Sequence, residues 1–221
     1  MLTFTLIMSG FLKQKGSYRK LRVYKVTEII YDLTFYFCEH YLKLGDRTVD
    51  QMVQAARSGK QNIAEGSKAV MTSAETEIKL TNVAKSSLEE LLLDYEDYLR
   101  VRSLCRWSTD HPRFERMRRF VTGEEFEKTY SGLMRRLSDE ELANMAITLI
   151  NQANYMLNRL IERQQELFLA NGGVREQMTR ARRQARATRS VKSDLSDNSD
   201  KSDRSDKSDR SDKSDRSDKS E

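Results

Sequence analysis

A stripe of small residues between Gln51 and Gly66 constrains the fold of this chain more than any other feature. The segment reads QMVQAARSGKQNIAEG, and alternating steps of four and three connect Met52, Ala56, Gly59, Ile63 and Gly66. This spacing places all five on one side of an α-helix. Two glycines and an alanine let another backbone come close, and the far side is polar. The segment therefore predicts a helix with a tight helix–helix seam, and it contains no recognisable catalytic group.

The chain has few residues that break helices. It contains one proline, Pro112, and nine glycines among 221 residues, and no alternating apolar pattern typical of a strand stands out. We therefore predict an all-α protein: an up-down four-helix bundle with an inserted connector, a short basic C-terminal helix and a disordered tail. The predicted boundaries are an N-terminal segment at 1–22, the bundle at 23–171 with its connector at 103–137, the basic helix at 172–189 and the tail at 190–221.

Apolar periodicity and capping residues place the four long helices. They are expected at Val23–Leu44, at Val49–Lys68, from a start near Thr72 to about Arg102, and from Ser138 to about Ala170. A capping box pairs a Ser or Thr with a Glu or Gln three residues later. The sequence predicts such boxes at Thr48/Gln51, Thr72/Glu75 and Ser138/Glu141.

Two of these helices have unusual surfaces. The first is apolar on two sides, because Ile29, Tyr31, Phe35 and Tyr36 extend beyond its inner stripe. It therefore needs a second partner, which is either a later segment or another subunit. The third helix is expected to expose an acidic face, which could dock against basic segments of a neighbouring subunit. Its acidic residues are Glu75, Glu77, Glu89, Glu90, Asp94, Glu96 and Asp97.

Charge is unevenly distributed along the chain. Residues 190–221 hold eight Lys/Arg and ten Asp/Glu, so the remaining 189 residues hold 31 and 24, a net charge of +7. The tail settles into a Lys-Ser-Asp/Arg-Ser-Asp repeat from Lys201, and its composition predicts disorder because nothing apolar offsets the cost of ordering it. The arginines of the body are clustered in two places, and their distribution matters more than the net charge.

Other functional classes find little support in the sequence. Cys38 lies among apolar positions and is expected in the core, and two unclustered cysteines fit a reducing cytoplasm without a disulfide framework or zinc site. A cluster of Cys105, Asp110 and His111 can be imagined, but proximity in sequence is not the geometry of a catalytic triad. Phosphate-binding glycine loops and membrane-spanning segments are absent from the sequence. We therefore expect a cytoplasmic non-enzyme with no cofactor and no membrane partner.

The second and third helices carry a family resemblance. The segment QAARSGKQNIAEG at 54–66, followed by ETEIKLTNVAKSSLEELLLDYEDYLR, resembles the bacterial four-helix-bundle family whose founding members are encoded in intervening sequences of large-subunit ribosomal RNA genes. The resemblance covers Tyr24–Arg102 and Ser138–Asn171, and the extension from Gly172 looks like the longer variant with a four helix bundle suffix. It implies an up-down bundle that assembles into a homo-oligomer, a pentamer in the short members. A related branch is the accessory protein of diversity-generating retroelements, which implies nucleic acid and a reverse transcriptase as partners.

Arginines are the strongest functional candidates. One group lies near Trp107, Phe114 and Phe120, and arginine with aromatic residues can grip a phosphate backbone and stack bases. A second, denser group follows Gly173. Two hypotheses stay open: the arginines bind RNA or DNA, or they pair with acidic helices of the protein's own subunits or of a protein partner. The candidate residues are Arg106, Arg113, Arg116, Arg118, Arg119, Arg175, Arg180, Arg182, Arg183, Arg186 and Arg189.

Overall fold

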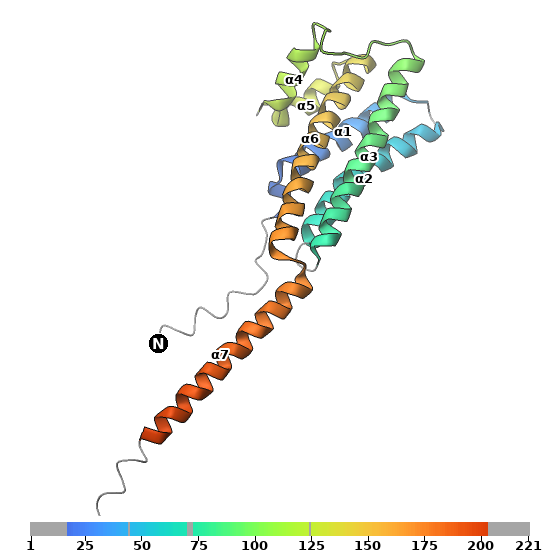
Figure 1. Cartoon of the computed structure of the whole chain (residues 1–221). Coiled ribbons are helices and arrows are strands. Elements are labelled where there is room, and N and C mark those ends of the chain that lie inside the picture. Colours follow the sequence, from blue (N-terminus) through green and yellow to red (C-terminus); the bar gives the residue numbers. More distant parts are fainter. Residues whose placement is uncertain (1–16, 44, 70–72, 124, 203–221) are drawn as a thin grey trace, which may run out of the picture. The chain divides into compact units, whose positions relative to one another are not determined.

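The computed structural model describes residues 17–43, 45–69, 73–123 and 125–202, with the backbone alone at 174 and 190–202. Every regular element within these ranges is helical, which confirms the all-α prediction for them (Figure 1). No described helix combines the length and the apolar composition that a membrane span needs. The elements are η1 (Tyr18–Lys20), α1 (Arg22–Tyr41), α2 (Arg47–Ala69), α3 (Ala74–Val101), α4 (Phe114–Thr122), α5 (Phe126–Met134), α6 (Asp139–Asn171) and α7 (Val174–Ser202).

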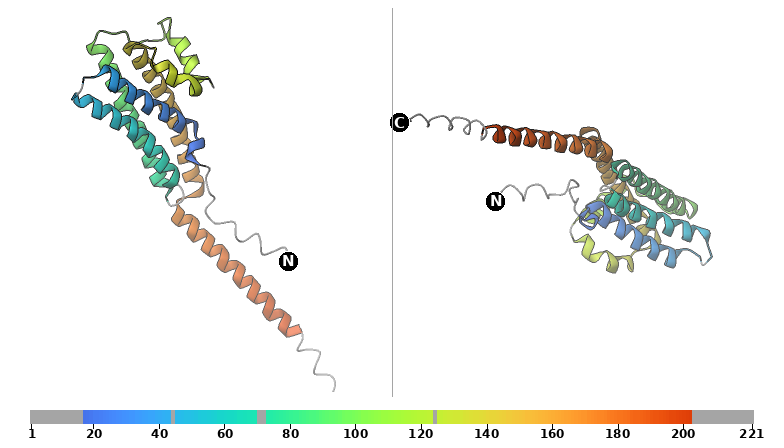
Figure 2. Two further views of the ribbon diagram at one scale, coloured as in Figure 1. Left: turned by 180° about the vertical axis from the view of Figure 1, so that it is seen from behind. Right: turned by 90° about the horizontal axis from the view of Figure 1, so that it is seen from below.

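Two compact units divide the chain, one ending at Val174 and one beginning at Arg175. In the first unit the long helices α1, α2, α3 and α6 lie side by side (Figures 1 and 2). Helix α2 packs against α1 and α3, and α6 packs against the same two helices. Their inward stripes form one hydrophobic core, whose largest fully buried side chains include Leu33, Phe37, Met52, Leu88, Leu91, Tyr95, Leu142 and Leu149.

The small-residue stripe of α2 is buried along its whole length. Met52 and Ala56 are fully inaccessible, and Gly59, Ile63 and Gly66 are also buried. A Cβ added at Gly66 would lie 3.3 Å from the carbonyl oxygen of Glu77 and 3.3 Å from Leu80 Cβ, both on α3. Gly66 thus lies inside α2 and against α3.

The observed N-terminal cap matches the predicted one at α6 and differs from it at α2 and α3. The capping box of Ser138 and Glu141 at the start of α6 is confirmed. Helix α2 begins earlier than predicted, and Asp46 caps it by accepting a hydrogen bond from the Thr48 N–H at 2.9 Å. Ser73 caps α3 in place of Thr72, which lies outside the described residues. Both differences arise because adjacent Asp, Ser and Thr residues are competing caps and local sequence ranks them weakly.

The connector packs against α1. Its helix α5 contacts α1, with Tyr130 Oη donating to Asp32 Oδ2 at 2.8 Å and Lys25 Nζ lying 3.3 Å from Glu127 Oε2. Burial and then the neighbouring Asp32 carboxylate raise the pKa of Tyr130 to about 12. Ile29 is buried, while Phe35 keeps 52% of its surface exposed. A later segment of the same chain therefore supplies part of the partner that α1 needs.

Helix α7 runs past the predicted end at Arg189 and reaches Ser202. Residues 190–202 contain neither glycine nor proline, so nothing in the covalent structure stops a helix once it has begun. The predicted tail therefore starts with helical backbone. Residues 203–221, and residues 1–16 of the predicted N-terminal segment, lie outside the described ranges.

Candidate nucleic-acid interface

Four of the five candidate arginines in the connector are held by carboxylates of the same chain. Arg106 Nη2 lies 2.7 Å from Glu96 Oε1 on α3, and Arg113 Nη1 lies 3.0 Å from Glu141 Oε1 on α6. On α4, Glu115 pairs with both of its helical neighbours, Arg118 at 3.4 Å and Arg119 at 3.3 Å. These pairs are partly exposed, so each contributes little to stability, but each occupies a guanidinium that phosphate would need.

Trp107 is largely buried where the connector meets α6, and the Arg113 guanidinium lies 5.6 Å from its ring centroid. Only 6% of its surface is exposed. Its backbone N–H donates to Asn144 Oδ1 at 2.7 Å, and its indole Nε1 donates to Glu140 Oε1 at 3.1 Å. The His111 ring stacks on the indole with centroids 4.9 Å apart. Contacts with α6 and His111 therefore engage the Trp107 side chain, and its part in gripping bases with the arginines stays a prediction.

A cavity of about 440 Å³ remains beside α4. Within the described part of the chain, Arg116 makes no ion pair, and Phe120 keeps 38% of its surface exposed. The walls are mainly apolar, and their charged residues are Arg113, Arg116 and Glu141. The lining residues are Trp107, Arg113, Arg116, Met117, Phe120, Leu133, Leu137 and Glu141.

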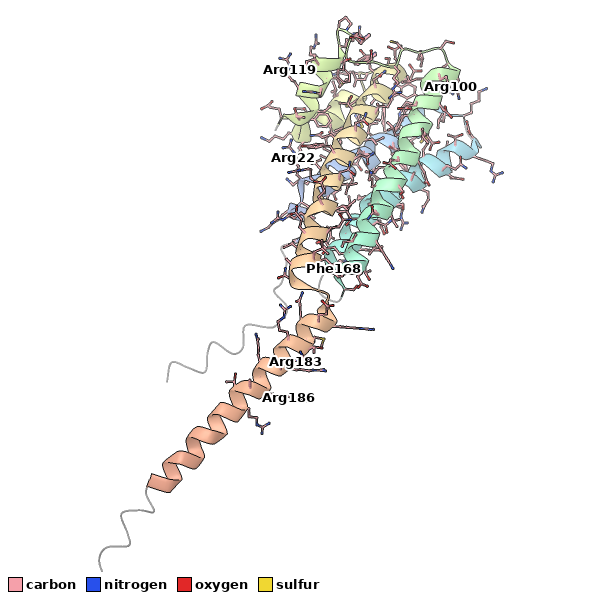
Figure 3. All side chains as sticks on the ribbon, viewed as in Figure 1. Arg22, Arg100, Arg119, Phe168, Arg183 and Arg186 are labelled. Atoms are coloured by element: carbon pink, nitrogen blue, oxygen red, sulfur yellow. The ribbon has the colours of Figure 1, made fainter. Side chains whose placement is uncertain are left out.

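The arginines of α7 are arranged differently. All six side chains are exposed, and none is ion-paired within the ranges that the structure describes. At about 100° per residue, Arg175, Arg182, Arg186 and Arg189 fall within roughly 60° of the helix circumference. Arg180 and Arg183 widen this arc and line a shallow groove with Arg175 and Thr179. Arg183 and Arg186 project outward from the helix (Figure 3).

Helix α3 presents the opposite charge. Exposed Glu90 and Asp97 lie on its outer face, and Asp94 is half-buried beside them. Burial, followed by the nearby carboxylates of Asp97 and Glu90, raises the pKa of Asp94. Negative charge on Asp97 and Glu90 thus adds to the effect of burial on this part of the helix.

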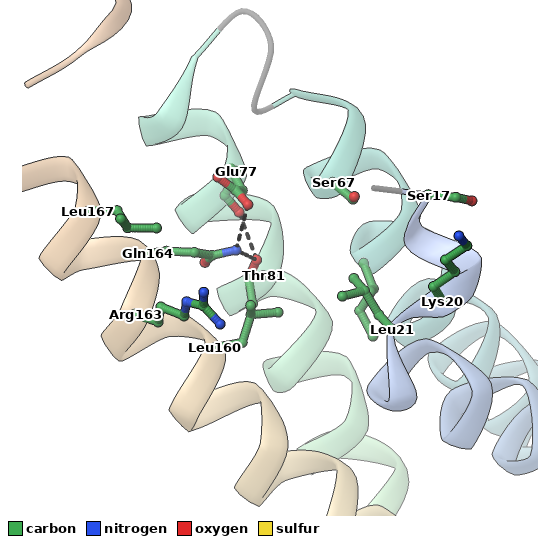
Figure 4. Close-up of a pocket in the computed structure, with 11 residues that line it drawn as sticks. Ser17, Lys20, Leu21, Ser67, Glu77, Thr81, Leu160, Arg163, Gln164 and Leu167 are labelled. Carbon is green, nitrogen blue, oxygen red and sulfur yellow. Dashed lines mark hydrogen bonds between the residues drawn. The ribbon is translucent and has the colours of Figure 1, made fainter. Parts of the chain in front are cut away.

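One residue assigned to that acidic face is instead in the core. Glu77 is 6% exposed and lines a cavity of about 250 Å³ whose walls come from η1, α2, α3 and α6 (Figure 4). Gln164 Nε2 donates to Glu77 Oε1 and to Thr81 Oγ1, each at 3.1 Å. Glu77 shares a helix face with Thr81 and Ala84, a spacing of four and seven that could have shown its inward position. Its role is to bind α3 to α6.

The remaining reactive side chains are engaged in local contacts. Cys105 Sγ donates to the Arg106 carbonyl oxygen, and His111 Nδ1 accepts from the Arg113 N–H at 3.3 Å. Neither contact aligns a nucleophile with a base. Among the described residues, no group of three or more His, Cys, Asp or Glu side chains is placed to hold a metal ion.

Comparisons of this chain with protein-family models, curated proteins and solved structures find no match. Its function is therefore inferred from the geometry above.

Proposed function

We propose that this protein is a non-enzymatic, homo-oligomeric helical bundle that binds RNA or DNA through the arginines of α7 without strong sequence preference. The observation that carries the proposal is the contrast between the two arginine groups. Those of the connector are mostly paired with carboxylates of their own chain, and those of α7 are exposed and unpaired within the described residues. Unpaired guanidinium groups can exchange condensed counterions for phosphate contacts.

The charge of α7 supports a polyanionic partner. Residues 174–189 contain six arginines and one glutamate, a net charge of +5 on about four helical turns. A surface of this kind contacts the nucleic-acid backbone, which carries no sequence information. Few aromatic or amide side chains accompany the arginines on α7, so strong base recognition is not expected.

The fold proposal follows from the packing of the long helices. We propose that α1, α2, α3 and α6 form the up-down four-helix bundle of the ribosomal RNA intervening-sequence type, with α4 and α5 as its insertion. The seam of α2 against α3, which carries the words QAARS and NIAEG, supports this assignment. The retroelement accessory branch of the same family makes a reverse transcriptase the protein partner to test first.

A second function is favoured by the connector. Arg106 and Arg113 already pair with helix carboxylates at 2.7 and 3.0 Å. This pairing supports a protein-interaction scaffold in which basic segments contact acidic helices of another subunit or of a partner. The two functions assign different arginines to different partners, so variants of each group separate them.

Replacing four arginines of α7 tests the nucleic-acid proposal. The variant Arg180→Gln, Arg182→Gln, Arg183→Gln and Arg186→Gln should bind a fluorescent single-stranded RNA at least about tenfold more weakly at low salt. A matched control removes the same charge from exposed positions elsewhere, through Arg57→Gln, Lys79→Gln, Arg135→Gln and Arg136→Gln. The control should bind almost as tightly as the wild type. Equal losses in both variants would mean that net charge, and not α7, attracts the RNA.

A further inference from the structure

An exposed leucine lies in the middle of the acidic face of α3. Leu93 keeps 61% of its surface exposed. Its helical neighbours one turn away in each direction are four carboxylates: Glu89, Glu90, Glu96 and Asp97. Lys85, Arg106 and Arg100 pair with Glu89, Glu96 and Asp97, and Glu90 makes no ion pair within the described residues. A large apolar side chain ringed by charge is unfavourable in water and typical of a residue that is buried in an interface, with the charged ring at the rim.

The surface around α4 has the complementary character. Its cavity of about 440 Å³ has apolar walls that include Met117 and Phe120, with Arg116 among the lining residues. Arg118 and Arg119 lie on the same short helix, so α4 carries three exposed arginines against the single carboxylate of Glu115. The apolar α4 cavity beside arginines is therefore complementary to the exposed Leu93 side chain beside carboxylates.

These two surfaces do not satisfy each other within one chain. No residue of α3 lines the cavity, and Leu93 stays exposed. The ion pair between Arg106 and Glu96 shows that arginines of the connector and carboxylates of α3 have compatible geometry for pairing. Both surfaces belong to the same chain, so a second copy can provide the missing half of each.

We propose that the acidic face of α3 in one copy docks into the α4 cavity of a second copy. Leu93 enters the apolar recess near Met117 and Phe120. Glu90 pairs with Arg116 at its rim, since both are exposed and neither makes an ion pair within the described residues. The two contact surfaces differ, so the association is head-to-tail, and an open assembly keeps one free α3 face and one free α4 cavity until a ring closes. This inference rests on the oligomeric part of the proposed function and specifies which surfaces make the oligomer.

Light scattering of the full-length protein tests the proposal. Wild-type protein should have a mass that is a multiple of the 25.8 kDa chain. Leu93→Glu should shift the mass to that of one chain, with a dissociation constant at least about thirtyfold larger, as for a central interface residue. Leu169→Glu changes a leucine on α6 that is 82% exposed and should leave the mass unchanged. A wild-type monomer at all concentrations, or an assembled Leu93→Glu variant, would overturn the proposal.

Charge reversal provides a second test that does not depend on one variant. One protein carries Glu90→Lys, and another carries Arg116→Glu. Each should be monomeric alone, and an equimolar mixture should assemble because every α3 face then finds an α4 surface of opposite charge. A mixture that stays monomeric would contradict the proposed pairing. The affinity of Leu93→Glu for RNA at low salt is measured separately and reports on α7. The proposed oligomer contact and the proposed binding of nucleic acid can therefore fail independently of each other.

Discussion

Gly59 on α2 faces Leu88 on α3 so closely that a Cβ built at Gly59 would lie 2.7 Å from Leu88 Cδ2. Ala84 and Leu88 are both fully buried on the opposing helix. The two helices therefore pack closely at Gly59, and this contact explains why α2 has a glycine inside a helix. A glycine there costs about 0.5–1 kcal/mol of helix stability, which the close packing offsets.

Replacing Gly59 tests the seam. Gly59→Leu should lower the free energy of unfolding by about 1–3 kcal/mol, because the added side chain must push α3 away. Gly132→Ala is the matched control, since a Cβ at Gly132 meets nothing within 4 Å and the residue is helical. That variant should gain up to about 1 kcal/mol. Thermal unfolding at one protein concentration measures the stability of both variants. An unchanged midpoint for Gly59→Leu would show that α2 and α3 can move apart without loss of stability.

Asn144 is expected to anchor the connector to α6. Its Oδ1 accepts from the Trp107 N–H at 2.7 Å, and its Nδ2 donates to the Cys105 carbonyl oxygen at 2.9 Å. Asn144→Ala should cost about 1–3 kcal/mol because it leaves buried backbone groups unpaired. Trp107 is the only tryptophan, so its fluorescence should shift to longer wavelength as the indole becomes hydrated.

The exposed Asn151 supplies the control for that experiment. Asn151→Ala removes the same side chain from the same helix and should change stability by less than about 0.5 kcal/mol. Fluorescence at the wild-type wavelength in Asn144→Ala would mean that other contacts hold Trp107 in place.

The two cysteines should react at very different rates. Cys38 is 3% exposed, and burial raises the pKa of its thiol to about 12, so almost no thiolate is available near pH 8. Cys105 is exposed. A thiol reagent such as iodoacetamide should therefore modify one site per native chain and two per unfolded chain. Cys105→Ser should abolish the native reaction, and rapid modification of Cys38 in that variant would show that the core opens readily.

The fold could be predicted largely because the long helices are strongly periodic. The α2 stripe and the apolar face of α3 are local patterns, and each places the same residues inward in the structure. Glu77 was misplaced because a carboxylate on an otherwise acidic helix resembles a solvated group. Its burial depends on Gln164, which lies 87 positions away in the chain. Such a pair is visible only when α3 and α6 are already packed together.

The candidate site was predicted less well, for a related reason. Arginine composition identifies where positive charge is concentrated, but the state of each guanidinium depends on long-range partners. Arg106 is separated from its partner by ten residues, and Arg113 from Glu141 by 28. Trp107 likewise has partners 33 and 37 residues away. From sequence patterns alone, both arginine groups are equally good candidates for phosphate contacts. Only the packed helices show that the connector arginines are mostly paired and that the α7 arginines are unpaired within the described residues.

The dependence of RNA affinity on salt tests the central claim, binding of nucleic acid through α7, most directly. A logarithmic plot of the association constant against salt concentration has a slope of about −0.7 for each phosphate contact with a single strand. If all six arginines of α7 contact phosphate, the wild-type slope should be about −4, and the four-arginine variant should flatten it by about 3. Absence of wild-type binding at low salt, or an equal slope in wild type and variant, would contradict the account.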